Sequence, residues 1–263
     1  MISMDKSTAW FINPYVPMRI WSSIRWRALA LARACGYRGD PRLFGVEVPL
    51  ALVPSKVVLC QLDALSYEAK EARYIQAYLP PGVEVLELGA SLGIVSSIIL
   101  GRQPARLVSY EAVGPLTEVA RQVVARNHPA ATWELVHCAI AAEGVDEVSF
   151  DWSPEHTQGG AVADESAKSL IRVPAVSLAG AIARHRLPVT AWLVMDIEGM
   201  EWELAQHQAE ALRHFDGIIV ECHQVRSGGR IVPHTEVLAE VSKAGFKVVA
   251  RRGQVSVLRR RSA

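Results

Sequence analysis

The stretch Val85-Leu-Glu-Leu-Gly-Ala-Ser-Leu-Gly93 joins an apolar, strand-like run to the start of a helical pattern. Glycines at such a turn let the backbone approach a ligand closely, and the helix N-terminus beyond it offers unpaired N–H groups. The spacing is G-x-x-x-G, whereas a nicotinamide dinucleotide site prefers G-x-G-x-x-G. The turn therefore predicts a ligand site of another kind at the end of this strand.

Two carboxylates indicate which ligand the turn would suit. Glu87 stands directly before the turn, where it would oppose a pyrophosphate but favour an amino group or a cation. Glu111 ends the next strand-like run, 18 residues beyond Gly93, and an acid there can accept hydrogen bonds from both ribose hydroxyls. S-adenosylmethionine combines a ribose, an amino group and a cationic sulfur, so it is the ligand that this order of elements predicts.

Strand-like and helical segments alternate from about residue 66 onward. This order predicts an α/β fold with a doubly wound, mostly parallel sheet and helices on both of its faces. The β-rich runs on either side of residues 251–254 predict a terminal hairpin, which would make the final strand antiparallel. A polar loop is expected around Gly159 and Gly160. The expected strands cover 83–88, 105–111, 132–138, 191–197 and 217–223, and the expected helices cover 67–79, 92–101, 115–127, 200–213 and 233–244.

Carboxylates follow two of the expected strands. The strands at 191–197 and 217–223 should be neighbours, and ligands of such sheets bind beyond the carboxyl ends of the strands. We therefore expect Asp196 and Glu198 to face Glu221 and His223 across the mouth of a cleft.

The same run carries two further acids, Glu201 and Glu203. Both would lie in the first turn of the next helix, where acids interact favourably with the helix dipole.

The sequence resembles the FkbM-type S-adenosylmethionine-dependent methyltransferases over roughly residues 65–225. The matching motifs are VLELGASLG (85–93), YEAVGPL (110–116) leading to RN (126–127), and VMDIEGMEWELAQH (194–207) followed by VECH (220–223). The D-x-E-G-x-E run after a strand is the most specific of them. The resemblance implies a class I methyltransferase (Rossmann-like) fold. It also implies methyl transfer to a hydroxyl oxygen, often on a sugar or another natural product.

The resemblance also implies which residues hold the cofactor. By position, it places Glu87, Gly89, Ser91, Gly93 and Glu111 at S-adenosylmethionine. The expected cofactor site further includes Ala90, Ala112, Cys138, Ala139 and Asp196.

The sequence departs from the family pattern at three positions. Ser91 stands where the family usually has Asn, Met195 where it has Lys, and Ala179 where it has Asp. Without the Lys, the acidic cluster is less neutralised, so the acceptor is the least defined part of the prediction.

Methyl transfer to a hydroxyl requires removal of its proton during the attack. His223, with an ordinary pKa of about 6.5, is the candidate base, and the alternative is that it caps a strand or binds substrate. Asp196, Glu198 and Glu221 are the expected acidic members of the catalytic site. Their sequence spacing with His223 selects no metal ion, so no metal is assigned.

The charge is distributed unevenly along the 263 residues. Residues 1–43 hold seven Lys/Arg and two Asp/Glu, residues 44–241 hold 14 and 25, and residues 242–263 hold seven and none. An amphipathic helix is expected near residues 18–33, with arginines outside an apolar stripe formed by Ile20, Trp21, Ile24, Ala28 and Leu31. We therefore divide the chain into a basic N-terminal arm with an accessory segment (1–65) and a methyltransferase domain (66–263).

The arm has several possible partners. A basic amphipathic helix can contact an anionic membrane surface weakly, or it can pack on its own domain or on another protein. No specific nucleic-acid contact is expected. The predicted partner of the catalytic domain is a small-molecule acceptor, which could be a saccharide.

The four cysteines are scattered, and the N-terminal region lacks a continuous apolar segment. These features favour a cytoplasmic protein without a signal peptide or membrane span. Two rival functions remain open: a nicotinamide-dependent oxidoreductase on a similar sheet, and a nonenzymatic module that binds a partner through its basic ends.

Overall fold

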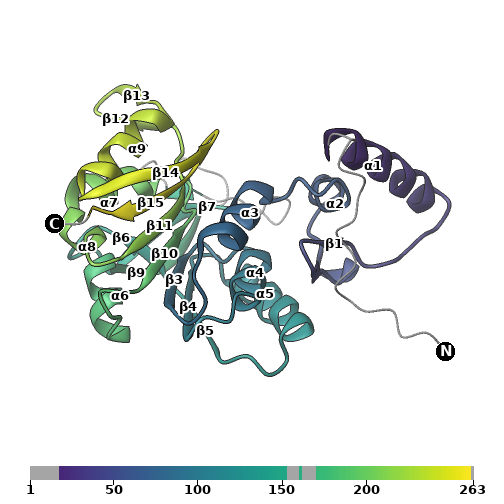
Figure 1. Cartoon of the computed structure of the whole chain (residues 1–263), viewed down its shortest axis with the longest axis horizontal. Coiled ribbons are helices and arrows are strands. Elements are labelled where there is room, and N and C mark those ends of the chain that lie inside the picture. The colour runs from purple at the N-terminus through teal and green to yellow at the C-terminus, as the bar shows by residue number, and fades with distance from the viewer. Residues whose placement is uncertain (1–17, 153–159, 162–169, 262–263) are drawn as a thin grey trace.

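A seven-stranded sheet forms the centre of the computed structural model, which describes residues 18–152, 160–161 and 170–261 (Figure 1). The strand order is β14-β15-β11-β10-β3-β4-β5. β11, β10, β3, β4 and β5 pair in parallel, and β15 is antiparallel to both β11 and β14. The strands are β3 (Glu84–Leu88), β4 (Arg106–Glu111), β5 (Trp133–His137), β10 (Trp192–Met195), β11 (Gly217–Glu221), β14 (Phe246–Arg252) and β15 (Val255–Arg260). The predicted α/β sheet with a C-terminal hairpin and an antiparallel final strand is confirmed.

Helices cover both faces of this sheet (Figure 1). One layer consists of α3 (Ala69–Tyr78), α4 (Ile94–Leu100) and α5 (Gly114–Asn127), and the other of α6 (Leu178–His185), α7 (Met200–His207), α8 (Ala209–Leu212) and α9 (His234–Lys243). The helix expected over 200–213 is two helices, because Gln208 interrupts it. Its buried side chain accepts a hydrogen bond from Leu178 N and donates one to Ala141 O.

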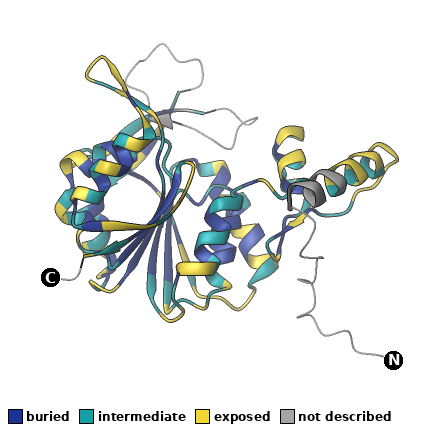
Figure 2. Ribbon diagram, turned by 45° about the horizontal axis from the view of Figure 1, so that its top comes forward, coloured by how far each residue is buried: buried dark blue, intermediate teal, exposed yellow. Residues whose placement is uncertain are grey.

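The strands are buried between the two helix layers (Figure 2). Successive side chains of a strand point to opposite faces. Leu86 and Leu88 accordingly lie in one core cluster, with the residues of α6 to α9, whereas Val85 lies in the other, with those of α3 to α5. Glu87 follows the register of Val85, so the strand directs its carboxylate toward α4 and away from α7.

A second sheet follows the order β6-β9-β7-β8. It contains β6 (Ala139–Ala141), β7 (Glu147–Asp151), β8 (Gly160–Ala161) and β9 (Leu170–Ser177). The prediction of a loop around Gly159 and Gly160 was wrong for Gly160, which lies in β8, and Gly159 lies outside the described residues. β7 pairs with β9, which lies about 20 residues further along the chain. Pairing between such distant segments leaves little pattern in a short window of sequence. A further hairpin is formed by β12 (Val225–Ser227) and β13 (Arg230–Val232).

The N-terminal segment contains α1 (Met18–Ala34), β1 (Arg42–Leu43), β2 (Val46–Glu47), a 3-10 turn (Leu50–Leu52) and α2 (Lys56–Asp63). Glu47 connects it to α5: the Glu47 N–H donates to Asn127 Oδ1 at 2.9 Å, and its carboxylate pairs with Arg126. Leu43 and Val46 belong to the same core cluster as Val85. The accessory segment therefore packs on the body of the protein, and the domain division at residue 65 stays a prediction.

Among the described side chains of helix α1, Arg33 links the helix to α2. Arg33 Nε lies 2.5 Å from Asp63 Oδ2 of α2, whereas Ala28 and Leu31 of the predicted apolar stripe are exposed. The side chains of Ile20, Trp21 and Ile24 lie outside the described residues. Membrane contact by this helix stays a prediction. Within the described ranges, no helix has the length and apolar character required to cross a bilayer.

Candidate active site

A cavity of about 640 Å³ opens at the carboxyl ends of β3, β4, β10 and β11. α2 and α3 contribute to its walls, so the accessory segment takes part in the site. The predicted site residues that line it are Gly89, Ser91, Glu111, Ala112, Cys138, Ala139, Asp196, Glu198 and Glu221. Nine residues from five separate stretches of sequence thus meet around one space, whereas Glu87, Ala90, Gly93 and His223 are not among its lining residues.

The turn after β3 is tied to the end of β4 through Glu111. The Ser91 N–H donates to Glu111 Oε2 at 2.7 Å, and the Val113 N–H donates to Oε1 at 2.8 Å. Burial raises the pKa of Glu111, and these backbone donors oppose the rise. A carboxylate oxygen can accept more than one hydrogen bond, so Glu111 retains acceptor capacity toward a ligand in the cavity.

The three other predicted cofactor residues support the turn from outside the cavity. Ala90 is buried, and Gly93 precedes α4 with a φ of +75°. Glu87 lies beneath the turn, where its Oε2 accepts hydrogen bonds from Ser96 Oγ at 2.6 Å and from Ser109 Oγ. Burial raises the pKa of Glu87 to about 7, even though both hydroxyls act to lower it.

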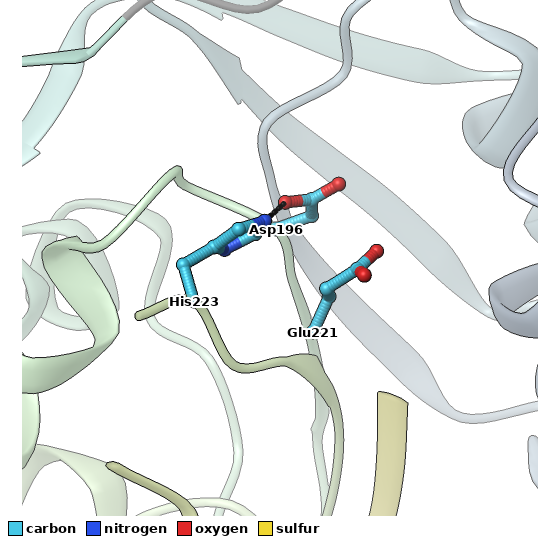
Figure 3. Close-up of side chains that lie close together, drawn as sticks. All are labelled: Asp196, Glu221 and His223. Atoms are coloured by element: carbon cyan, nitrogen blue, oxygen red, sulfur yellow. Dashed lines mark ion pairs between the residues drawn. The ribbon is translucent and has the colours of Figure 1, made fainter. Parts of the chain in front are cut away.

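The loop between β10 and α7 (residues 196–199), called the acidic loop below, faces the end of β11, as expected. His223 Nε2 lies 3.7 Å from Asp196 Oδ1 and 3.5 Å from Glu198 Oε2. Figure 3 shows the imidazole beside the Asp196 carboxylate, with Glu221 projecting from the neighbouring strand. Glu198 has a φ of +52°, a strained conformation for a residue with a side chain, and such strain concentrates at functional sites.

Glu201 has a larger role than its place in the first turn of α7 indicated. Its fully buried carboxylate accepts hydrogen bonds from Ile197 N and Gly199 N, both at 3.0 Å, and thereby shapes the acidic loop. Its Oε1 also lies 3.3 Å from His223 Nδ1. The expected first-turn position is confirmed, but the pairing with His223 could not be read from local sequence.

Carboxylates surround His223 on both ring nitrogens. Burial alone would lower the pKa of His223, but the hydrogen bond and charge of Glu201, with the charges of Asp196 and Glu198, raise that pKa to about 9. Asp196, Glu221 and His223 each offer a ligand atom within 4.8 Å of the others, which is compatible with a metal ion. We assign no metal to them, because the imidazole is already engaged with the carboxylates.

Sequence reasoning missed a group of cavity residues on and before α3. Tyr67, Glu68, Lys70 and Glu71 all line the cavity. Tyr67 Oη lies 3.2 Å from Ser91 Oγ, and Lys70 Nζ lies 3.8 Å from Glu221 Oε1. A pair of acids three residues apart on an amphipathic helix is a common surface pattern, so nothing local marked these residues as part of a site.

Solved structures with similar folds include methyltransferases. EvdMO1 is 17% identical over 73% of this chain, with a TM-score of 0.40, and this chain spans 41% of EvdMO1. The N-terminal domain of EvdMO1 with SAH bound is matched over 81% of its length, at the same identity and a TM-score of 0.42. Magnesium protoporphyrin IX methyltransferase from Synechocystis PCC 6803, with bound SAM, is 11% identical over 95% of this chain and 100% of its own, with a TM-score of 0.45.

No curated protein matches the sequence at a significant level. The family model described as the methyltransferase FkbM domain matches residues 112–248, about half of the chain. This range includes the D-x-E-G-x-E run and the Glu221 and His223 positions. The chain therefore belongs to the FkbM methyltransferase family and is an S-adenosylmethionine-dependent methyltransferase.

Proposed function

We propose that the protein transfers a methyl group from S-adenosylmethionine to a hydroxyl oxygen of a sugar-containing or other small-molecule acceptor. The cluster of Asp196, Glu198 and His223 carries this proposal. A hydroxyl is a poor nucleophile until it loses its proton, and such a cluster can accept that proton. Carboxylates at the cavity wall would also accept hydrogen bonds from the other hydroxyls of a sugar.

The donor would occupy the part of the cavity beside Gly89, Ser91 and Glu111. Glu111 would accept hydrogen bonds from the ribose hydroxyls, and Ser91 would hold the turn against the donor. Ala112, Cys138 and Ala139 would border the adenine, since they follow the ends of the next two strands. Glu87, Ala90 and Gly93 would act by shaping the turn, because they lie behind it.

The acceptor would lie beyond the sulfonium, against Asp196 and Glu198. The acceptor proton would pass to the cluster formed by these carboxylates and His223, whose imidazole has a pKa raised to about 9 by its acidic neighbours. Glu221 would form an ion pair with Lys70 and so keep this ammonium group at the cavity wall. In this scheme His223 does not touch the acceptor but receives its proton through a carboxylate that lines the cavity.

The proposal is tested with S-adenosylmethionine that carries a ¹³C-labelled methyl group. Incubation with a panel of glycosides and simple alcohols should yield a labelled methyl ether, identified by the chemical shift of its carbon and by mass spectrometry. A labelled N-methyl or C-methyl product would contradict transfer to oxygen. Donor binding without turnover on any hydroxyl, amine or carbon acceptor would favour the nonenzymatic alternative.

We expect Glu111→Ala to weaken binding of S-adenosylmethionine about 10- to 150-fold, the range for a hydrogen bond to a charged group. Calorimetric titration measures this change, and circular dichroism checks that the variant is folded. Glu118→Ala on the exposed side of α5 is the matched control, because Glu118 is exposed and accepts a hydrogen bond from Gln122 of the same helix. An unchanged affinity in folded Glu111→Ala would remove Glu111 from the donor site.

A further inference from the structure

Two acidic residues, one in α3 and one just before it, form a further acidic part of the cavity wall. Glu68 and Glu71 line the same space as Asp196 and Glu221. Glu68 adopts a φ of +45°, so its backbone is strained at the point where it meets the cavity. The cofactor motifs and the D-x-E-G-x-E run assign no role to either residue.

Four carboxylate oxygens in this region are buried without a hydrogen-bond partner. They belong to Glu68, Glu71, Glu87 and Asp196. The same four residues line a smaller void of about 10 Å³, close to the size of one water molecule, and Gly89 lines both this void and the main cavity. Glu71 is 5% exposed and Glu87 is 1% exposed, so water cannot solvate these oxygens freely.

Among the described residues, nearby cations offset the charge of these carboxylates only in part, because Lys70 lowers the pKa of Glu71 without cancelling the effect of burial. Lys70 lies 3.8 Å from Glu221, and His223 is paired with Asp196, Glu198 and Glu201. Glu71 and Glu221 hydrogen-bond to each other, which requires that one of the two carboxyls holds a proton. A buried carboxylate that lacks a partner is costly, so the arrangement favours a cationic ligand.

We propose that Glu68 and Glu71 are specificity-determining residues that make the enzyme bind cationic S-adenosylmethionine in preference to its neutral product, S-adenosylhomocysteine. The two molecules share the adenosine, the amino group and the carboxylate, and they differ in the charge and the methyl group at sulfur. When the methyl group leaves with the acceptor oxygen, the sulfonium becomes a neutral thioether. The carboxylates then lose their cation, which weakens binding of the product.

This proposal has a pH consequence. Burial, followed by the hydrogen bond with Glu221, raises the pKa of Glu71 to about 8. A cation favours the ionised carboxyl, so donor binding should release protons, and donor affinity should rise with pH until about 8 and then level off. Affinity for S-adenosylhomocysteine should change less over the same range, because its sulfur brings no charge.

Charged groups from several elements surround Glu71. Glu87 of β3 and Asp196 after β10 line the same small void. Glu68 and Lys70 precede it on the chain, and Glu221 faces it from β11. α4 contributes no titratable side chain, and the two arginines at the end of β15, Arg259 and Arg260, pair with Asp216. Among these groups, Glu221 and Lys70 are the ones that act on Glu71 most strongly.

The test compares the affinities of the full-length protein for S-adenosylmethionine, S-adenosylhomocysteine and sinefungin, an analogue with an amine in place of the sulfonium. We expect the parent to bind the two cationic ligands at least about tenfold more tightly than S-adenosylhomocysteine, the scale of one charged interaction. Glu68→Gln and Glu71→Gln should each reduce this ratio about fivefold or more, mainly by weakening the cationic ligands. Glu118→Gln on α5 should leave the ratio unchanged.

Three results would overturn the proposal. The parent could bind the donor and the product equally, or both variants could weaken all three ligands by the same factor, which would indicate a structural role. Alternatively, chelator-treated protein could bind Mn²⁺ through Glu71 while the donor-to-product ratio stays the same in Glu71→Gln. In that case the carboxylates would serve a metal ion.

The inference rests on the donor of the family and not on the proposed hydroxyl acceptor. Because each measurement is a binding measurement without acceptor, its outcome is independent of whether oxygen methylation is found.

Discussion

Replacing Gly89 by alanine is expected to destabilise the fold by about 2–5 kcal/mol and to abolish donor binding. Gly89 has a φ of +90°, and a Cβ atom there would lie 2.0 Å from the backbone oxygen of Asp196. Neither partner can move alone, because the Gly89 N–H donates to Tyr110 O and the Asp196 N–H donates to Leu88 O. The added methyl group would therefore force β3 and β10 apart at the point where the cavity opens.

Gly82→Ala is the matched control for this prediction. Gly82 has a φ of +74°, but a Cβ atom there would meet nothing within 4 Å. It should therefore show only the backbone cost of about 1–2 kcal/mol and retain the donor affinity of the parent. Urea denaturation and calorimetric titration measure both effects. Equal stability of the two variants would show that the contact between Gly89 and Asp196 does not constrain the site.

The sheet could be predicted from the sequence because its signals are local. Each of β3, β4, β10 and β11 is a short apolar run followed by a turn or a helical pattern, and the terminal hairpin is marked by Arg251-Arg252-Gly253-Gln254. The pairing of β10 with β11 follows from the order of a doubly wound sheet. From the sequence alone, that pairing places Asp196 and Glu198 opposite His223.

The parts that were missed depend on contacts between distant segments. Glu71 and Glu221 are 150 positions apart and meet only because α3 packs beside β11. The second sheet depends on β9 lying between β6 and β7. Neither relation leaves a pattern in a short window of sequence, whereas the D-x-E-G-x-E run does.

The acidic partners of His223 make its imidazole more basic than its sequence position indicates. From its sequence position the imidazole would titrate near 6.5, but Glu201 could not be recognised as its partner on Nδ1. With a pKa raised to about 9, most of the imidazole is protonated at neutral pH. The neutral imidazole, which is the form that can accept a proton, becomes abundant only as the pH approaches this raised pKa. The acid limb of the rate profile should therefore lie well above pH 6.5.

We expect His223→Ala to lower turnover by about 10² to 10⁴-fold, the usual range for general acid–base catalysis, and to keep donor affinity close to that of the parent. In the parent, kcat/KM for the donor should rise with pH toward an apparent pKa near 9, and the variant should lose this His223 limb and keep only the rise to about pH 8 that Glu71 adds to donor binding. The sulfonium of the bound donor disfavours a positive imidazole, so the limb should lie at lower pH in kcat than in kcat/KM. Steady-state rates between pH 6 and 10 with the acceptor identified by ¹³C transfer provide the measurement.

Two further variants separate catalysis from structure. His223→Gln keeps an N–H donor toward the buried Glu201, so it should fold like the parent while it loses turnover as His223→Ala does. His207→Ala removes an exposed histidine that lies 3.5 Å from Glu203, and it should leave both the rate and the pH profile unchanged. If His223→Gln instead keeps the turnover and pH profile of the parent, proton removal belongs to Glu198, to Glu221 or to solvent. His223 would then only hold the acidic loop against the end of β11.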